Sequence, residues 1–288
     1  YNNDGFLDLF VTALSNGSNY LYRNNGNGTF EKDVKQIELY QALDNIIGLD
    51  VCFFDFDNDG FLDLLVVGEQ DEKRENGSGV RLFHNDGTGS FKDVSTILPP
   101  DLTSGYRIAV ADYNEDGDMD IFIAGINGGV KLLRNDGGNI NKYLKVQLVG
   151  LRAGSGKNNH FGIGSKLEVS VGDLYQMRVV TEPVTHFGIG QKLKADVVRI
   201  QWPNGVPQNL FYPGSDQDIV ENQILKGSCV FLYAWNGQKY EFVTDVLWRS
   251  ALGMPRGIMG GTTIYAFPNS ADEYLKIPRN MIKAKDGK

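Results

Sequence analysis

Short apolar runs recur along the first 140 residues and predict β-strands in three similar units. The runs are four to seven residues long, rich in Val, Ile, Leu and Phe, and bounded by Gly, Asn and Asp, as is typical of strands. In each unit one run follows an acidic loop, another leads into a polar hairpin, and two units have a run before the loop. The predicted strands are 7–11, 20–23 and 29–34; 48–54, 62–67, 80–84 and 90–94; and 106–111, 119–124 and 130–134.

The repeat length indicates the architecture of this region. The aspartates that close the loops, Asp8, Asp63 and Asp120, are separated by 55 and 57 residues. Four antiparallel strands in a unit of this length are typical of a β-propeller blade. The segments 35–47 and 95–104 are then linkers between blades.

The blades predicted here do not close a propeller, which needs four to eight of them. The first unit lacks its opening strand, and the third lacks its fourth strand. We therefore expect the chain to be a fragment, with the remaining blades in sequence before Tyr1 or in another chain. We place the first domain boundary near residue 140, so that residues 1–140 form the incomplete propeller.

Residues 141–226 alternate between apolar and polar positions and predict a second β domain. Its expected strands have one apolar face and Gly/Asn turns between them, as in a small β-sandwich or barrel-like module. After it, residues 227–288 predict a truncated β segment that begins with a hairpin around Asn236-Gly237. The expected strands are 143–148, 165–171, 175–180 and 197–202, then 229–235 and 239–243. The fold class is therefore all-β, with residues 250–263 expected to form a loop or lid.

The acidic loops repeat one nine-residue pattern that predicts calcium binding. Positions one, three and five carry side-chain oxygens, position six is Gly, position seven offers a carbonyl, and position nine is Asp. Clustered oxygen ligands on a Gly-centred turn suit Ca²⁺. The candidate ligands are Asn2, Asp4, the Phe6 carbonyl and Asp8; Asp55, Asp57, Asp59, the Phe61 carbonyl and Asp63; and Asp112, Asn114, Asp116, the Asp118 carbonyl and Asp120.

Two alternatives compete with the calcium hypothesis. Asp, Asn and Gly also form solvated turns without a metal, but three copies, each attached to an apolar strand, favour binding. Mg²⁺ requires a tighter octahedron and retains its waters, so Ca²⁺ suits the loops better. The expected role is structural, because carboxylates held this close would otherwise repel one another.

Charge and composition narrow the function classes. The net charge of −8 would fall to −2 with one Ca²⁺ in each loop, so the acidity indicates metal sites rather than a surface for basic partners. No basic stripe with interleaved aromatic residues predicts nucleic-acid binding, and no apolar run is long enough for a membrane span. Cys52 is expected to be a buried free thiol, although a disulfide with Cys229 is the alternative.

Residues 1–140 resemble the FG-GAP/VCBS repeats of integrin-α-type β-propellers, through the nine-residue loops. Residues 142–225 resemble the ASPIC/UnbV module found after such repeats in bacterial secreted proteins and in a cartilage acidic protein. The segments that carry this second resemblance are 162–169, 186–190 and 197–205. The resemblance implies a secreted or surface protein whose repeats bind Ca²⁺, and it implies no catalytic residue.

The remaining chemistry favours binding over catalysis. The three histidines are His84, His160 and His186; we expect His84 to have a structural surface role. The other two precede identical Phe-Gly-Ile-Gly turns, where turn stabilisation competes with a two-histidine metal site. No nucleophile elbow or phosphate loop is present. We therefore expect adhesion, protein or glycan binding, or scaffolding; the alternatives are a subunit of an extracellular assembly or filament, and a propeller hydrolase or lyase whose site lies outside this chain.

Overall fold

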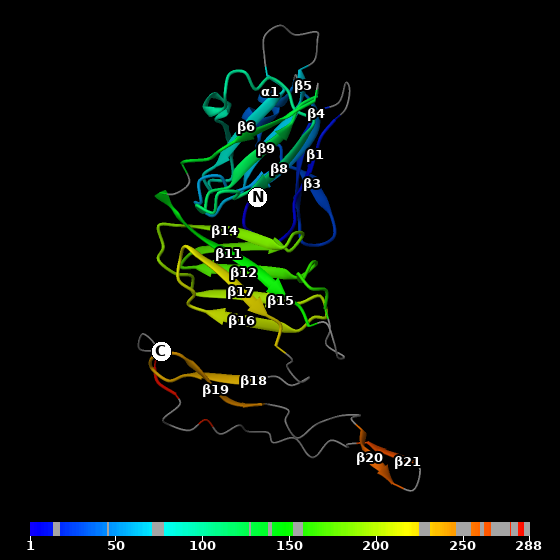
Figure 1. Ribbon diagram of the computed structural model, residues 1–288, viewed down its shortest axis with the longest axis vertical. Helices are drawn as coiled ribbons and strands as arrows, with labels where there is room; N and C mark the ends of the chain where they lie inside the picture. Colours follow the sequence, from blue (N-terminus) through cyan, green and yellow to red (C-terminus); the bar gives the residue numbers. More distant parts are fainter. Residues whose placement is uncertain are drawn as a thin grey trace. The chain divides into compact units, whose positions relative to one another are not determined.

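The protein is nearly all β, as predicted: 47% of it is strand and 5% helix. The computed structural model describes residues 1–13, 18–44, 46–70, 78–126, 128–137, 140–151, 158–224, 231–245, 255–259, 262–265, 277 and 282–284. Contacts divide the chain into one unit at residues 1–224 and another at 225–288 (Figure 1). The domain boundaries at residues 140 and 226 stay predictions.

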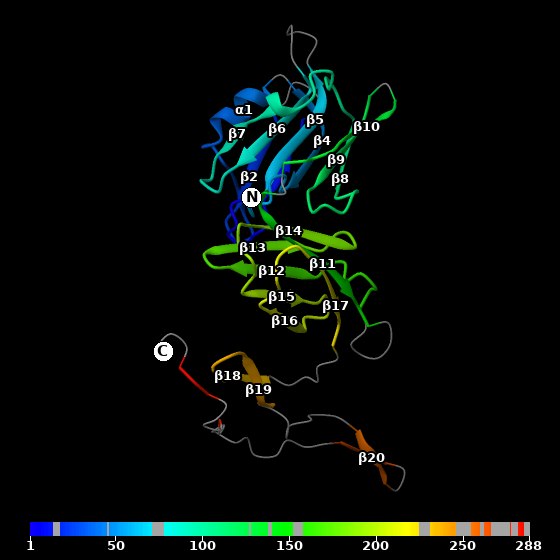
Figure 2. The same cartoon turned by 60° about the vertical axis from the view of Figure 1, so that its left-hand side comes forward.

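Three antiparallel sheets form the first part of the larger unit (Figures 1 and 2). The second sheet is a four-stranded blade in which neighbours in sequence are neighbours in space, and the first and third sheets have three strands each. The strands are β1 (Leu9–Val11), β2 (Tyr20–Asn24) and β3 (Phe30–Lys32); β4 (Ile46–Phe54), β5 (Asp63–Gln70), β6 (Val80–Asn85) and β7 (Phe91–Asp93); and β8 (Arg107–Ala111), β9 (Asp120–Ala124) and β10 (Val130–Leu133).

Both expected linkers contain a short helix. The segment 35–47 includes α1 (Ile37–Leu43), and the segment 95–104 includes the 3-10 helix η1 (Ser95–Ile97). Leu39 and Leu43 are four residues apart on α1 and are both buried, because side chains at this spacing share one face of a helix. They belong to the core between the first two blades, so this connection is part of the packed structure.

The central strand β5 is buried on both faces. Leu64 and Val66 point into the core shared with the first blade, and Leu65 and Val67 point into the core shared with the third. All four side chains are fully buried. The period of two along a strand sends successive side chains to opposite faces, so one continuous apolar run joins three sheets.

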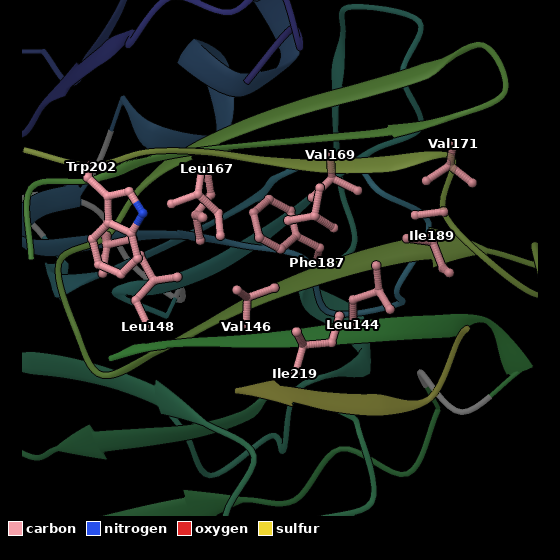
Figure 3. Close-up of a cluster of buried hydrophobic side chains, with 14 residues drawn as sticks. Leu144, Val146, Leu148, Leu167, Val169, Val171, Phe187, Ile189, Trp202 and Ile219 are labelled. Carbon is pink, nitrogen blue, oxygen red and sulfur yellow. The ribbon is translucent and has the colours of Figure 1, made fainter. Parts of the chain in front are cut away.

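Residues 142–222 form a sandwich of two sheets, the kind of module that the alternation predicts. One sheet has the order β14–β11–β17 and the other β13–β12–β15–β16. The sheets contribute side chains from both sides to one core, which includes Leu144, Phe187 and Trp202 (Figure 3). The strands are β11 (Lys142–Val149), β12 (Lys166–Val171), β13 (Leu174–Val179), β14 (Val184–Gly190), β15 (Val197–Gln201), β16 (Pro207–Phe211) and β17 (Gln217–Asn222).

Two of the module's features differ from the sequence prediction. The strands β16 and β17 were not expected, and β17 pairs parallel to β11. The second Phe-Gly-Ile-Gly segment was expected to be a turn like the first, but it belongs to β14, which pairs with β11. The first copy, His-Phe-Gly-Ile-Gly at 160–164, does form turns. Two hydrogen bonds of the Asn159 side chain to the Ile163 backbone, both at 2.7 Å, close the first copy as a turn, whereas pairing with β11 makes the second copy a strand.

The unit at residues 225–288 contains two described hairpins. The predicted hairpin is present as β18 (Phe231–Trp235) and β19 (Tyr240–Asp245), with Gly237 at φ 101° in its turn. The segment expected to be a loop or lid contains β20 (Pro255–Met259) and β21 (Thr262–Tyr265), which pair antiparallel.

Two further observations concern the described residues alone. None of their helices combines the length and the apolar character needed to cross a membrane. Cys52 has a free, partly buried thiol, and burial raises its pKa to about 12, so this thiol is protonated at physiological pH. Cys229 lies outside the described residues.

The double-sided burial of β5 predicts a large effect of truncating one of its side chains. We expect Leu65→Ala to lower the free energy of unfolding by about 2–5 kcal/mol, since it removes buried methyl groups and leaves a cavity. Val130→Ala is the control: Val130 is 68% exposed, and its truncation should change stability by less than about 0.5 kcal/mol. Urea denaturation measures both, and equal effects would contradict the packing described.

Candidate metal centre

The three acidic loops share one backbone conformation. Their fourth residues adopt left-handed φ angles of 56°, 59° and 63°, and their glycines at position six adopt 86°, 96° and 94°. Glycine reaches such angles without a steric penalty, so the pattern requires it at this position. The residues are Asn3, Asn58 and Glu115 at position four, and Gly5, Gly60 and Gly117 at position six.

The second loop brings its predicted ligands together. Oxygen atoms of Asp55, Asp57 and Asp63 lie within 4.8 Å of one another, and Asp57, Asp59 and His84 form a second group of the same size. The Asp59 and Gly60 amides donate to the two oxygens of Asp55, at 3.1 and 2.9 Å, and so hold the loop closed.

Without a cation, burial and mutual repulsion make the ionised form of these carboxylates unfavourable. Burial, then the charges of Asp59 and Asp57, raise the pKa of Asp55 to about 8. Burial is the main cause that raises the pKa of Asp63 to about 9 and of Asp59 to about 6. Buried carboxylates that resist ionisation together are relieved by a hard cation. The donor set of this loop therefore fits Ca²⁺.

The third loop repeats the same hydrogen bonds. The Asp116 and Gly117 amides donate to Asp112 at 3.1 and 2.8 Å, and the Asn114 side chain donates to Asp116 at 2.7 Å. The Asp118 side chain accepts a bond from Asn58 in the second loop, at 3.2 Å. This loop has an amide at position three, where the second loop has a carboxylate, so its predicted ligand side chains carry one negative charge less.

The first loop has the same scaffold with fewer side-chain ligands. The Tyr1 nitrogen donates to Asp8 at 3.0 Å, just as the Phe56 amide donates to Asp63. The Asn2 side chain donates to Asp4 at 2.9 Å. The structure thus places all the predicted residues in three equivalent loops, and their calcium occupancy stays a prediction.

An asparagine at the end of β2, at the end of β6 and two residues after β10 holds the closing aspartate of each unit, and our sequence analysis missed this role. The backbone amides of Asn24, Asn85 and Asn135 donate to Asp8, Asp63 and Asp120 at 2.8–2.9 Å. Their side chains donate to the carbonyl before the closing aspartate. The signal was present in the sequence, as the Asn-x-Gly that ends each third strand.

The glycine of this hairpin makes room for position seven of the metal loop. A Cβ on Gly87 would lie 2.4 Å from the Phe61 ring, and one on Gly26 would lie 2.6 Å from the Phe6 ring. The residues predicted to offer carbonyl ligands therefore also cover the hairpin with their side chains.

His84 lies closer to the second loop than its predicted surface role implied. Its Nε2 is 3.0 Å from an oxygen of Asp57 and 3.7 Å from one of Asp59. At the same position in the other units, Arg23 and Arg134 pair instead with Glu31 and Asp136. His84 is thus the only one of these three side chains that contacts loop carboxylates.

The metal loops lie against the two-sheet module. The Gly190 amide donates to the Asn58 carbonyl at 2.9 Å, and His186 Nε2 lies 3.1 Å from the Gly117 carbonyl. Burial lowers the pKa of His186 to about 4, so its neutral ring donates to this carbonyl. There is no room for a side chain at Gly188, where a Cβ would lie 2.2 Å from Asp55. The loops are therefore the contact surface between blades and module.

Comparison with known families agrees with this geometry. Residues 1–66 and 55–123 match the FG-GAP-like repeat family, and residues 154–224 match the ASPIC and UnbV family. The chain carries FG-GAP-like repeats followed by an ASPIC/UnbV domain. Each repeat match begins and ends with a metal loop, and the two overlap on the second loop. FG-GAP repeats often bind calcium, and no curated protein matches the chain.

The contact between the third loop and the ASPIC/UnbV domain predicts the effect of filling Gly117. A Cβ there would lie 2.0 Å from the Tyr143 ring. We expect Gly117→Ala to destabilise the protein through both the left-handed φ, about 1–2 kcal/mol, and this overlap, about 1–3 kcal/mol. Chemical denaturation gives the total.

Gly89→Ala is the matched control, because Gly89 has a similar φ of 85° and no atom near a new Cβ. Gly89→Ala should lower the free energy of unfolding only by the contribution of the left-handed φ. Adding Tyr143→Ala should reduce the effect of Gly117→Ala to that of Gly89→Ala. An unchanged effect in that background would show that the Tyr143 contact is absent.

The raised pKa values of Asp55 and Asp63 predict a stability that depends on pH in metal-free protein. The folded state then holds protons that the unfolded state releases above about pH 4, so stability falls as the pH rises towards 8. The slope approaches about 1.4 kcal/mol per pH unit for each group. Urea denaturation at pH 5 and pH 8 measures it. Saturating Ca²⁺ should remove the fall, and a metal-free protein equally stable at both values would contradict the prediction.

Proposed function

We propose that this protein is an extracellular calcium-binding β-propeller-type protein that acts in adhesion, protein or glycan binding, or scaffolding. The observation that carries the proposal is the second loop, in which the oxygens of three aspartates lie within 4.8 Å of one another. Two further loops have the same backbone. FG-GAP-repeat proteins are typically extracellular or attached to the surface, where calcium is abundant.

The number and kind of oxygen ligands in the loops favour Ca²⁺ over Mg²⁺. The loops offer carboxylate, amide and carbonyl oxygens, which suit the six to eight ligands of Ca²⁺. Asp55, Asp57, Asp59 and Asp63 would hold the ion in the second loop, with the Phe61 carbonyl. Asp112, Asn114, Asp116 and Asp120 would hold it in the third, with the Asp118 carbonyl. The bound ion would supply positive charge to these carboxylates, of which Asp55, Asp63 and Asp120 are buried.

The metal would act on the assembly of the larger unit, and not on its loops alone. The carbonyls of Asn58 and Gly117, both within metal loops, bond to β14 of the ASPIC/UnbV domain. An ion that fixes the loops also fixes this contact surface. The blades and the domain then form one rigid platform, as a protein that presents surfaces to a partner requires.

The contacts of the histidines support binding rather than catalysis. This holds for two of the three histidines: His186 Nε2 lies 3.1 Å from the Gly117 carbonyl, and His84 Nε2 lies 3.0 Å from Asp57. A general base needs a nitrogen within reach of a substrate proton. We therefore propose that the protein is not an enzyme.

Calcium-dependent unfolding tests the proposal. At a calcium concentration one hundred times the Kd, each occupied site should add about 2.7 kcal/mol to the free energy of unfolding. Asp59→Ala and Asp116→Ala should each remove most of the contribution of one loop. Thermal and chemical denaturation in calcium and in EGTA measure the difference.

Asp101→Ala is the control, since Asp101 is exposed and pairs with Lys131, not with a metal loop. It should leave the calcium effect unchanged. Equal stability of the unsubstituted protein in calcium and in EGTA would overturn the proposal.

A further inference from the structure

The second metal loop differs from the other two at position three. In the first and third loops this position is Asn2 or Asn114, whose side-chain amide donates to the aspartate at position five, at 2.9 and 2.7 Å. In the second loop both positions are aspartates, Asp57 and Asp59. Ionised carboxylates accept hydrogen bonds but donate none. This pair therefore requires a positive group that the other two loops do not need.

The imidazole of His84 on β6 faces this pair of aspartates. Its Nε2 lies 3.0 Å from Asp57 Oδ2 and 3.7 Å from Asp59 Oδ2. The other oxygen of each carboxylate accepts a backbone amide of the loop. Asp57 Oδ1 accepts from Asp59 at 3.3 Å, and Asp59 Oδ1 accepts from Phe61 at 2.8 Å. The loop thus fixes both carboxylates and leaves their Oδ2 atoms on the side of the histidine.

The contact between His84 and Asp57 has the length of a hydrogen bond but is not one. The Nε2 atom is buried and makes no hydrogen bond among the described residues, because such a bond requires the N–H to point at its acceptor. Ligands of one metal ion each point at the ion and lie beside their neighbours. At metal–ligand distances of about 2.1 Å, two ligands at right angles are about 3.0 Å apart and two at a tetrahedral angle about 3.4 Å. The two measured distances therefore suit ligands that share an ion.

The surroundings of His84 hold the imidazole in place. His84 pairs with Lys92 of β7 across the sheet, and its ring packs edge-on against Phe56, with the centroids 5.7 Å apart. The side chains of His84, Asp57 and Asp59 are each 24–29% exposed. Water can therefore reach the group and complete the coordination of an ion that three protein ligands hold.

The mixed donor set determines the class of ion. Ca²⁺ takes oxygen ligands, whereas imidazole nitrogen is a ligand for zinc and other transition metals. Single ligand atoms of Asp57, Asp59 and His84 lie within 4.8 Å of one another. We propose that these three residues form a site for a divalent transition-metal ion, for which Zn²⁺ is the probe. The other two units cannot form it, because they have Arg23 and Arg134 in place of the histidine.

This site shares Asp57 and Asp59 with the calcium site proposed above for the same loop. A transition-metal ion at His84 therefore competes with Ca²⁺ in the second loop and leaves the first and third loops unaffected. By reciprocal linkage, each ion weakens the binding of the other by the same factor. Only this competition rests on the proposed function; the affinity for the transition-metal ion does not.

Calorimetric titration of the full chain with Zn²⁺, after a chelating resin has removed bound metal, tests the site. His84→Gln should weaken zinc binding by at least about tenfold, since even groups that only support a metal ligand contribute about 10–100-fold. His84→Arg, which introduces the residue of the other two units, should have the same effect. Titration of calcium-loaded protein, in which the loops are held by the ion, should show the same difference between variants.

His160→Gln is the matched control. His160 lies in the turns at 160–164 and not at a metal loop, so its replacement should leave zinc binding unchanged. This control also tests the two-histidine alternative that pairs His160 with His186. Loss of zinc binding in His160→Gln and not in His84→Gln would place the ion there and overturn the inference.

Nitrogen NMR of the histidine side chains shows whether His84 is a ligand or only a neighbour of the ion. Coordination through Nε2 leaves the ring proton on Nδ1. One equivalent of Zn²⁺ should therefore shift the Nε2 resonance of His84 and leave those of His160 and His186 in place. An unshifted His84 resonance in zinc-saturated protein would contradict the assignment.

The outcomes for zinc and calcium are separable. Calcium binding without zinc binding would overturn the transition-metal site and leave the proposed function intact; His84 would then serve only as an ion-pair partner of the loop. Zinc binding that depends on His84, without any calcium binding, would support the site and overturn the proposed function. Equal zinc affinity of His84→Gln and the unsubstituted protein would overturn the inference.

Discussion

The repulsion among buried carboxylates in the metal loops is the constraint on which the rest of the larger unit depends. Asp55 and Asp63 are buried within a few ångström of each other, and no polypeptide gains stability from like charges in such a place. The loops nevertheless lie at the junction of the blades and the ASPIC/UnbV domain. Because these carboxylates lie where the blades contact the domain, a cation that binds them also stabilises that contact.

Around this junction the blades provide rigidity by ordinary packing. The strand β5 has no exposed face over its first six residues, and its side chains alternate between two cores. The loop aspartate Asp63 is its first residue. The position of the closing ligand is therefore set by a strand that is buried on both faces, and backbone amides from Phe56 and Asn85 hold its two oxygens.

The sequence predicts the structural features that repeat along the chain, but it does not predict those that depend on pairing between distant strands. The loops, their glycines and most blade strands follow from local pattern, because each unit restates the same turn chemistry. The peptide His-Phe-Gly-Ile-Gly shows the limit, since it forms turns at 160–164 and strand β14 at 186–190. Hydrogen bonds between the Asn159 side chain and the Ile163 backbone close the first copy as a turn, whereas the second copy pairs with β11 along its length. The ion pair between Lys145 and Asp112 was equally hidden, because only tertiary contact brings these two residues together.

The parallel pairing of β11 with β17 affects the order in which the ASPIC/UnbV domain folds. These two strands begin at residues 142 and 217. The sheet that contains β14 is therefore completed only by β17, the last strand of the domain. Contacts between residues so far apart in sequence form slowly, because a long loop must be closed before they contribute. During synthesis the surface that faces the metal loops is thus finished only after the blades have emerged. The N-terminal blades are therefore already synthesised, and their surface is present, when the C-terminal domain folds against it.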